Sequence, residues 1–167
     1  SGEGLHIKGG NGSGKSTLLR IILGITTPTK GLIKRCNEDL KISYLGHKNA
    51  IKNYLTPIEN LELLFNDVEI KIAYEWLHKF NLSHVQDELS ASLSFGQQKK
   101  LALIRVLAQS PELIVLDEPF VGLDQTAADQ LNNFLEKQLS EGVGLILTSH
   151  INPKISCKVL DLEVKNA

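Results

Sequence analysis

The chain has no methionine and only two cysteines among its 167 residues. Cys36 and Cys157 form no Cys-x-x-Cys pair, which argues against a structural zinc site and favours a reducing, cytoplasmic setting. Because an initiator methionine is absent, we expect that residues of a longer protein precede Ser1. No apolar run approaches the roughly 20 residues that cross a bilayer. A role at a membrane would therefore require a partner.

Excess charge of either sign is also lacking. The net charge is −1, and the 18 basic residues are scattered along the chain. A nucleic-acid partner is not expected, since such proteins carry a clustered basic surface. The length, with 42% hydrophobic and 22% charged residues, predicts one soluble domain with a substantial core.

The most informative segment runs from residue 9 to residue 17 and fits the phosphate-loop (P-loop) pattern G-x-x-x-x-G-K-[ST]. Its glycines let the backbone form a nest of N–H donors around a polyphosphate. Lys15 is expected to reach the outer phosphates and Ser16 to bind Mg²⁺. The predicted phosphate-binding residues are Gly9, Gly10, Asn11, Gly12, Ser13, Gly14, Lys15, Ser16 and Thr17. The alternative, a glycine-rich turn with a solvated lysine, leaves the flanking strand and helix patterns unexplained.

The hydrophobic pattern predicts an α/β fold. Short apolar runs without alternation are typical of buried strands in a parallel sheet covered by helices. Apolar residues at three and four spacing predict helices in the middle of the chain. Strands are predicted at 5–7, about 40–45, 113–116 and 145–148, and helices at 16–23, 60–65, 72–80, from 94 through 107, and 126–139. We expect a P-loop NTPase core, at about 1–47 and 110–167, interrupted by a helical subdomain at about 48–109.

Two acidic residues follow the predicted strand 113–116. Carboxyl ends of parallel strands form the ligand-binding edge of such sheets, so Asp117 is placed to hold Mg²⁺ through water. Glu118 is placed to orient or deprotonate an attacking water. His150 follows the strand 145–148 and is expected at the same edge. The alternatives are a solvated turn for the acids and a surface position for His150.

A second candidate anion site lies at residues 93–98, Leu-Ser-Phe-Gly-Gln-Gln. Ser94 and Gln97 have capping-box spacing, which alone predicts a helix start. That reading does not explain Gly96, which disfavours a helix. A helix N-terminus presenting the Ser94 hydroxyl and the Gly96 N–H also suits an anion. One chain does not readily place two such sites on one triphosphate, so the second is expected to serve another subunit.

These motifs, with Asp117-Glu118-Pro119 and Gly122-Leu123-Asp124, resemble the nucleotide-binding domain of ABC ATPases over nearly the whole chain. The resemblance implies a head-to-tail homodimer that sandwiches two ATP molecules and docks with integral-membrane subunits at the cytoplasmic face of the inner membrane. It implies further that N-terminal antiparallel strands are missing here. The roles that it implies are Glu118 as catalytic base, His150 as switch residue, Ser94, Gly96 and Gln97 as contacts to the partner's ATP, and Asp124 as a dimer contact. From local pattern alone, Asp124 is a helix N-cap.

A finer resemblance lies in the segment 44–52, Tyr-Leu-Gly-His-Lys-Asn-Ala-Ile-Lys, and points to the haem-exporter ATPases of bacterial cytochrome c maturation. That group has a histidine, here His47, where most ABC ATPases have a glutamine that contacts Mg²⁺ and the attacking water. Asn49 and Ala50 depart from the Pro-Gly that is usual in the group. The expected function is ATP hydrolysis coupled to haem delivery or haem-chaperone release. Alternatives are another ABC transporter, a soluble ABC ATPase and a small P-loop kinase.

Overall fold

The computed structural model describes residues 2–34, 37 and 39–162. Its contacts divide the chain into two compact units. The first consists of Ser1–His47, Pro111–Pro119 and Leu135–Ala167, and the second of Lys48–Ser110 and Phe120–Phe134. The second unit thus includes residues 120–134 in addition to the segment of the expected helical insert.

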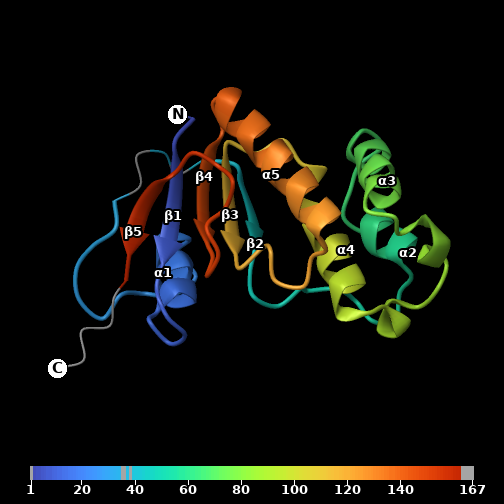
Figure 1. Ribbon diagram of the computed structural model, residues 1–167, viewed down its shortest axis with the longest axis horizontal. Helices are drawn as coiled ribbons and strands as arrows, with labels where there is room; N and C mark the ends of the chain where they lie inside the picture. Colours follow the sequence, from blue (N-terminus) through green and yellow to red (C-terminus); the bar gives the residue numbers. More distant parts are fainter. Residues whose placement is uncertain (1, 35–36, 38, 163–167) are drawn as a thin grey trace. The chain divides into compact units, whose positions relative to one another are not determined.

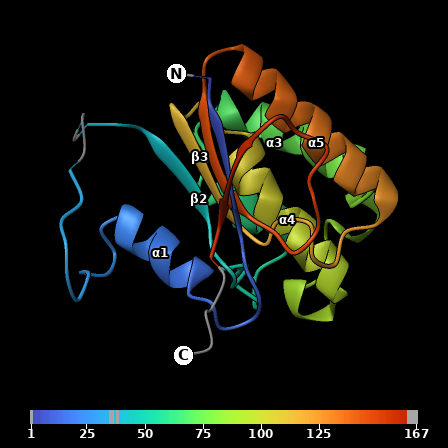
Figure 2. The same cartoon turned by 60° about the vertical axis from the view of Figure 1, so that its left-hand side comes forward.

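The first unit is built on a five-stranded parallel sheet with the order β2-β3-β4-β1-β5 (Figure 1). The strands are β1 (Gly4–Lys8), β2 (Ile42–Leu45), β3 (Leu113–Asp117), β4 (Gly144–Thr148) and β5 (Lys158–Asp161). Helix α1 (Lys15–Ile22) lies along one face of this sheet (Figure 2). The fully buried side chains of Ile7, Leu19 and Val115 join that helix to the strands. The predicted α/β P-loop core with a parallel sheet is confirmed.

The register of the sheet collects four loops at one edge. Ile7 and Asp117 both pair with Thr148, and Leu45 pairs with Leu116. Because all strands are parallel, the chain leaves β1, β2, β3 and β4 at the same edge. The P-loop, His47, Glu118 and His150 therefore follow strand ends that face one way. The sequence predicts this shared edge for Asp117 and His150.

The second unit is helical. Its elements are α2 (Pro57–Glu62), α3 (Glu69–Lys79), the short 3₁₀ turns Ser83–Val85 and Ser90–Ser92, α4 (Phe95–Leu107) and the first part of α5 (Gln125–Ser140). The Trp76 ring contacts Phe80, at 5.3 Å between centroids, and meets Phe134 edge-on at 5.6 Å. Edge-to-face packing of this kind stabilises an aromatic core. Within the described residues, no helix is long and apolar enough to cross a membrane.

Candidate functional site

The P-loop connects β1 to α1 through a left-handed turn. Gly14 is the N-cap of α1 with φ of 92°, a conformation that glycine adopts without steric cost. The Lys15 side chain, only 8% exposed, turns back over the loop. Its ammonium donates to the carbonyl oxygens of Gly9, at 2.8 Å, and Gly10, at 3.1 Å. The cation is thereby held above the loop, at the N-terminus of the helix.

The loop has room and polarity for a phosphate group. A Cβ built on Gly10, Gly12 or Gly14 would have no neighbouring atom within 4 Å in the described structure, so these glycines border open space. The Ser13 hydroxyl is buried and has no hydrogen-bond partner among the described residues. A buried polar group without a partner costs free energy, which a phosphate oxygen would relieve. The loop therefore fits the predicted ligand.

Thr148 joins the ends of β3 and β4. Its hydroxyl donates to Asp117 Oδ1 at 2.7 Å and accepts the backbone N–H of Glu118 at 2.9 Å. All three residues are buried, with Asp117 1% and Thr148 0% exposed. The register also pairs Asp117 with Thr148 across the strands. One hydroxyl group thus fixes both the first carboxylate and the backbone of the second.

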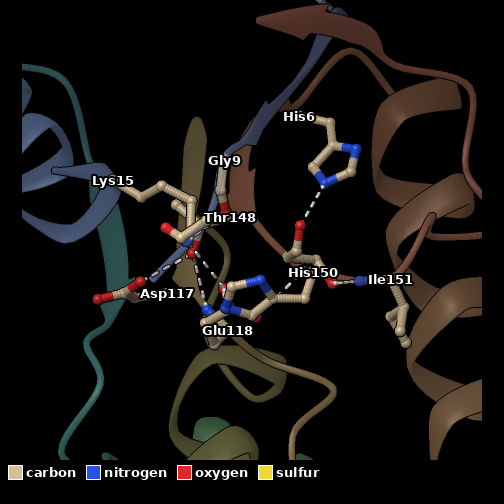
Figure 3. A network of polar contacts seen from close by, with 10 residues as sticks. His6, Gly9, Lys15, Asp117, Glu118, Thr148, His150 and Ile151 are labelled. Carbon is tan, nitrogen blue, oxygen red and sulfur yellow. Dashed lines mark hydrogen bonds and ion pairs between the residues drawn. The ribbon is translucent and has the colours of Figure 1, made fainter. Parts of the chain in front are cut away.

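Glu118 is the meeting point of the site (Figure 3). Its backbone has φ of 49°, an unusual conformation for a residue with a side chain, and it turns the chain sharply after β3. Carboxylate Oε1 lies 3.8 Å from Lys15 Nζ and 3.3 Å from His150 Nε2. The backbone N–H of His150 donates to Oε2 at 3.3 Å. Oε1 is buried and has no hydrogen-bond partner in the described chain.

A metal ion would have few protein ligands at this site. No group of three or more His, Cys, Asp or Glu side chains in the described ranges is arranged to hold a metal. Mg²⁺ often takes only one or two protein oxygens, with water and substrate phosphates completing its shell. Asp117 and Ser16 offer such oxygens, a carboxylate and a hydroxyl. This donor set fits magnesium and lacks the nitrogen and sulfur ligands typical of zinc.

The segment after β2 carries His47, which is exposed. Tyr44 leans over this turn, because a Cβ on Gly46 would lie 2.7 Å from the Tyr44 hydroxyl oxygen. Burial, and next the negative charge of Asp117, raise the pKa of Tyr44. The structure therefore places a phenol, which the sequence did not indicate, in the electrostatic neighbourhood of the metal-ligand candidate.

The Leu93-to-Gln98 motif opens α4 in the second unit. The Gln97 N–H donates to Ser94 Oγ at 3.2 Å, and the Ser94 N–H donates to Gln97 Oε1 at 2.8 Å, which is a complete capping box. A Cβ on Gly96 would lie 2.7 Å from the carbonyl oxygen of Gly122. The glycine at the second helical position is therefore explained by a close backbone approach.

Asp124 follows Gly122 and caps α5. Its Oδ1 accepts the N–H of Ala127 at 2.9 Å, and its Oδ2 accepts the ammonium of Lys100 from α4. The Lys100 ammonium and, next, the Ala127 N–H hold the pKa of the Asp124 carboxyl below its ordinary value. The same ammonium donates to the Phe80 carbonyl at the end of α3. Within this unit, the predicted signature motif and the Gly122-Leu123-Asp124 segment lie in contact.

Comparison of the chain with known proteins identifies the family to which it belongs. Residues 1–121 match the family model described as ABC transporter. The chain belongs to the ABC transporter family. It is accordingly an ABC ATPase, an ATP-binding and ATP-hydrolysing subunit of an ABC complex.

Individual relatives of this ABC ATPase agree with that assignment. The chain is 38% identical, over 89% of its length and 76% of the relative's, to "Cytochrome c biogenesis ATP-binding export protein CcmA" of Sodalis glossinidius. It is 36% identical, over 94% and 85%, to the protein of the same name in Rickettsia felis. The dimeric structure of the ABC cassette MJ0796 in a post-hydrolysis state, bound to ADP and Pi, matches 99% of this chain and 84% of that one with a TM-score of 0.80 at 27% identity.

The sequence pattern does not predict three residues that contribute to the site. Thr148, Ser149 and His6 were seen only as strand or strand-end residues, although each makes a buried polar contact. The sequence signal that could have indicated them is the pair of hydroxyl residues, Thr148 and Ser149, directly before the candidate residue His150. Which groups they meet depends on the strand order β3-β4-β1, which local pattern does not contain.

Proposed function

We propose that this ABC ATPase powers a membrane complex of cytochrome c maturation, coupling ATP hydrolysis to haem delivery or release of a haem chaperone. Its similarity to CcmA proteins, at 34–38% identity over about nine tenths of the chain, supports this specific role. Within that similarity, the segment 44–52 resembles the haem-exporter group most specifically, because the resemblance sets His47 where most ABC ATPases have glutamine. We place the protein at the cytoplasmic face of the inner membrane, bound through integral-membrane subunits.

The chemistry that we propose centres on Glu118, and the observation that carries it is the convergence of Lys15 and His150 on this carboxylate. Glu118 accepts a proton from a water molecule that attacks the γ-phosphorus of ATP. The bond between the γ-phosphorus and the bridging oxygen breaks, and ADP leaves with that oxygen. Lys15 binds the outer phosphates, and His150 and His47 contact the γ-phosphate or the water. Mg²⁺, held by Ser16 and through water by Asp117, would neutralise phosphate charge.

We further propose that two copies pack head to tail, so that Ser94, Gly96 and Gln97 of one contact the ATP held by the other. Asp124 would then lie at the dimer contact. This rests on the dimeric state of the MJ0796 cassette and on the anion-binding character of the α4 N-terminus. Glu118→Gln in the complete protein should bind ATP and accumulate as a dimer, while ADP should leave it monomeric. Light scattering measures this, and a monomer with both nucleotides contradicts the sandwich.

The membrane partner is proposed to dock on the helical insert between residues 48 and 86. Large apolar side chains stand exposed on this part of the second unit, namely Tyr54 at 70%, Leu63 at 59%, Leu64 at 45% and Val68 at 70%. Such exposed apolar groups mark interaction sites on otherwise polar surfaces. Cross-links from purified membrane complexes should map to these residues. Cross-links confined to β5 would overturn the docking proposal.

The enzymatic role is tested with three variants. Glu118→Gln should lower kcat by about 10²-fold to 10⁴-fold, the usual contribution of a general base. Lys15→Ala should abolish ATP binding in calorimetry without unfolding the protein, because its side chain contacts the loop rather than the core. Glu136→Gln, an exposed carboxylate on α5, is the matched control and should hydrolyse ATP like the wild type.

The physiological role is tested in cells. A strain that carries only the Glu118→Gln protein should lose covalently bound haem from its c-type cytochromes while keeping its b-type cytochromes. The complete protein, purified from membranes, should bring down integral-membrane subunits of the same system. Normal c-type cytochromes in that strain, or partners from an unrelated transporter, would reject this role while leaving the ATPase assignment intact.

A further inference from the structure

His6 is a buried histidine in the middle of β1 that the proposed chemistry does not use. It is 2% exposed and lies between β4 and β5, paired in register with Leu147 and Val159. The neighbouring residues Leu5 and Ile7 belong to the apolar core with α1. Because side chains alternate along a strand, His6 projects to the other face of the sheet. A buried polar ring at such a position needs a hydrogen-bond partner.

The partner of His6 is the backbone at the end of β4. His6 Nε2 lies 3.1 Å from the carbonyl oxygen of Ser149. Figure 3 marks this contact with a dashed line from the His6 ring. A carbonyl oxygen only accepts hydrogen bonds, so Nε2 carries the proton and donates. Ser149 itself is 1% exposed, and its hydroxyl oxygen accepts the N–H of Ile151 at 3.1 Å. The turn after β4 is thus held at both its carbonyl and its side chain.

The peptide group that His6 contacts also contacts the proposed base. Its carbonyl belongs to Ser149 and its N–H to His150, and this N–H donates to Glu118 Oε2 at 3.3 Å. A peptide group is planar, so fixing the carbonyl direction fixes the N–H direction. From the same turn, His150 Nε2 approaches Glu118 Oε1 at 3.3 Å. The orientation of one peptide plane therefore links His6 to both oxygens of the carboxylate.

We propose that His6 is a positioning residue for ATP hydrolysis. It holds the Ser149–His150 peptide so that the peptide N–H and the His150 ring both contact the Glu118 carboxylate. The inference rests on the proposed role of Glu118 as base. His6 lies on β1, directly before the P-loop, so it joins the phosphate-binding strand to the turn that orients the base. Loss of its donor frees the peptide to rotate. Misplacement of reacting groups by about 1 Å lowers rates by up to about 10²-fold.

The test compares two side chains of equal length in the complete protein. Gln at position 6 places an N–H donor at the same number of bonds from the backbone as His Nε2, and Met has a similar shape but no donor. His6→Gln should keep kcat within about twofold of the wild type, and His6→Met should lower kcat about tenfold with KM for ATP unchanged. His78→Met, an exposed histidine of α3, is the control and should have no effect.

The outcomes separate this inference from the proposed function. Wild-type kcat in a folded His6→Met variant, or an equal fall of kcat in the Gln and Met variants, overturns the role of His6. Full activity of Glu118→Gln instead overturns the base that His6 is said to position. If His6→Met does not fold, nitrogen NMR of the wild-type imidazole still decides, because an unprotonated Nε2 cannot donate to Ser149.

Discussion

Thr148 donates its hydroxyl hydrogen to the Asp117 carboxylate at 2.7 Å, across two neighbouring strands of the sheet. The same oxygen accepts the N–H of Glu118 at 2.9 Å. Glu118 needs this support, since its backbone lies in the left-handed region with φ of 49°. A single hydroxyl therefore sets the geometry of both acids on which the proposed hydrolysis depends.

Removal of the Thr148 hydroxyl should impair catalysis even when the volume of the side chain is conserved. Thr148→Val has nearly the same volume but leaves two buried polar groups unpaired, which costs about 1–3 kcal/mol each. We expect kcat to fall at least about tenfold and the free energy of unfolding to fall as well. Thr148→Ser retains the hydroxyl and should remain near wild type in ATPase assays. Equal kcat values for the two variants would show that the hydroxyl is not required.

The sequence was sufficient to place the two acids and the strand-end histidine at one edge of the sheet and the P-loop between a strand and a helix, because each of these segments follows a buried strand. Parallel strands then force those segments to one edge, and the structure has Lys15, Glu118 and His150 together. The capping box of Ser94 and Gln97 was likewise predictable from spacing alone. These features are local in sequence, and they come together because parallel strands end at the same edge of the sheet.

What could not be predicted depends on long-range pairing. All four residues of β5 are exposed, and the strand mixes Lys158 and Asp161 with two apolar residues, so it carries no pattern of a buried strand. The contact between His6 and Ser149 joins residues 143 positions apart. The approach of Gly96 to Gly122 depends on tertiary packing of α4, which no helix propensity encodes. Such contacts follow from strand order and helix packing.

A methyl group on Gly96 should destabilise the second unit. On helix propensity alone, Gly96→Ala would stabilise α4 by up to about 1 kcal/mol. The new Cβ would lie 2.7 Å from the Gly122 carbonyl oxygen, and backbone there must shift. We expect a net loss of about 1–3 kcal/mol in urea unfolding, as in other overpacked sites. A variant more stable than wild type would contradict this expectation and would show that the backbone at Gly122 shifts at little cost in free energy.

Ala50 has φ of 52°, a left-handed backbone conformation that glycine adopts more readily than alanine. Left-handed backbone costs an L-residue about 1–2 kcal/mol. Glycine removes this cost, but its greater conformational entropy in the unfolded chain cancels part of the gain. Ala50→Gly should therefore raise the free energy of unfolding by about 0.5–1 kcal/mol. The Arg105 guanidinium donates to the Ala50 carbonyl at 2.9 Å, and this bond is retained because it involves backbone.

The control for Ala50 is a glycine at a position with ordinary helical backbone. Ala73 is buried within α3, and Ala73→Gly should lower stability by about 1 kcal/mol or more. Chemical denaturation of both variants gives the comparison. Opposite signs support backbone strain at Ala50, whereas losses in both variants would show that its conformation is not strained.

Asp124 should make stability depend on pH in the acid range. Its pKa in the folded protein is lowered below the ordinary 3.8 by the Lys100 ammonium and then by the Ala127 N–H. A lowered folded-state pKa means that the carboxylate stabilises the protein above the unfolded pKa, and that this contribution is lost as pH falls through the folded pKa. The contribution is modest, since the side chain is 56% exposed and solvent screens its ion pair.

The variants Asp124→Asn and Asp124→Ala separate the charge from the helix cap. Asparagine keeps an acceptor for the Ala127 N–H, so at pH 7 it should lose less than about 1 kcal/mol, the usual limit for an exposed ion pair. Alanine loses the cap as well, and should cost about 1 kcal/mol more. The deficit of Asp124→Asn should shrink as pH falls below 3.8, because the unfolded wild-type chain then binds a proton, and it should vanish below the lowered pKa of the folded carboxyl. Urea unfolding at pH 7 and at pH 3 measures this, with Asp67→Asn, an exposed carboxylate in the same unit, as control. A deficit that stays constant over this range would show that the charge of Asp124 does not contribute, and that its effect is confined to capping α5.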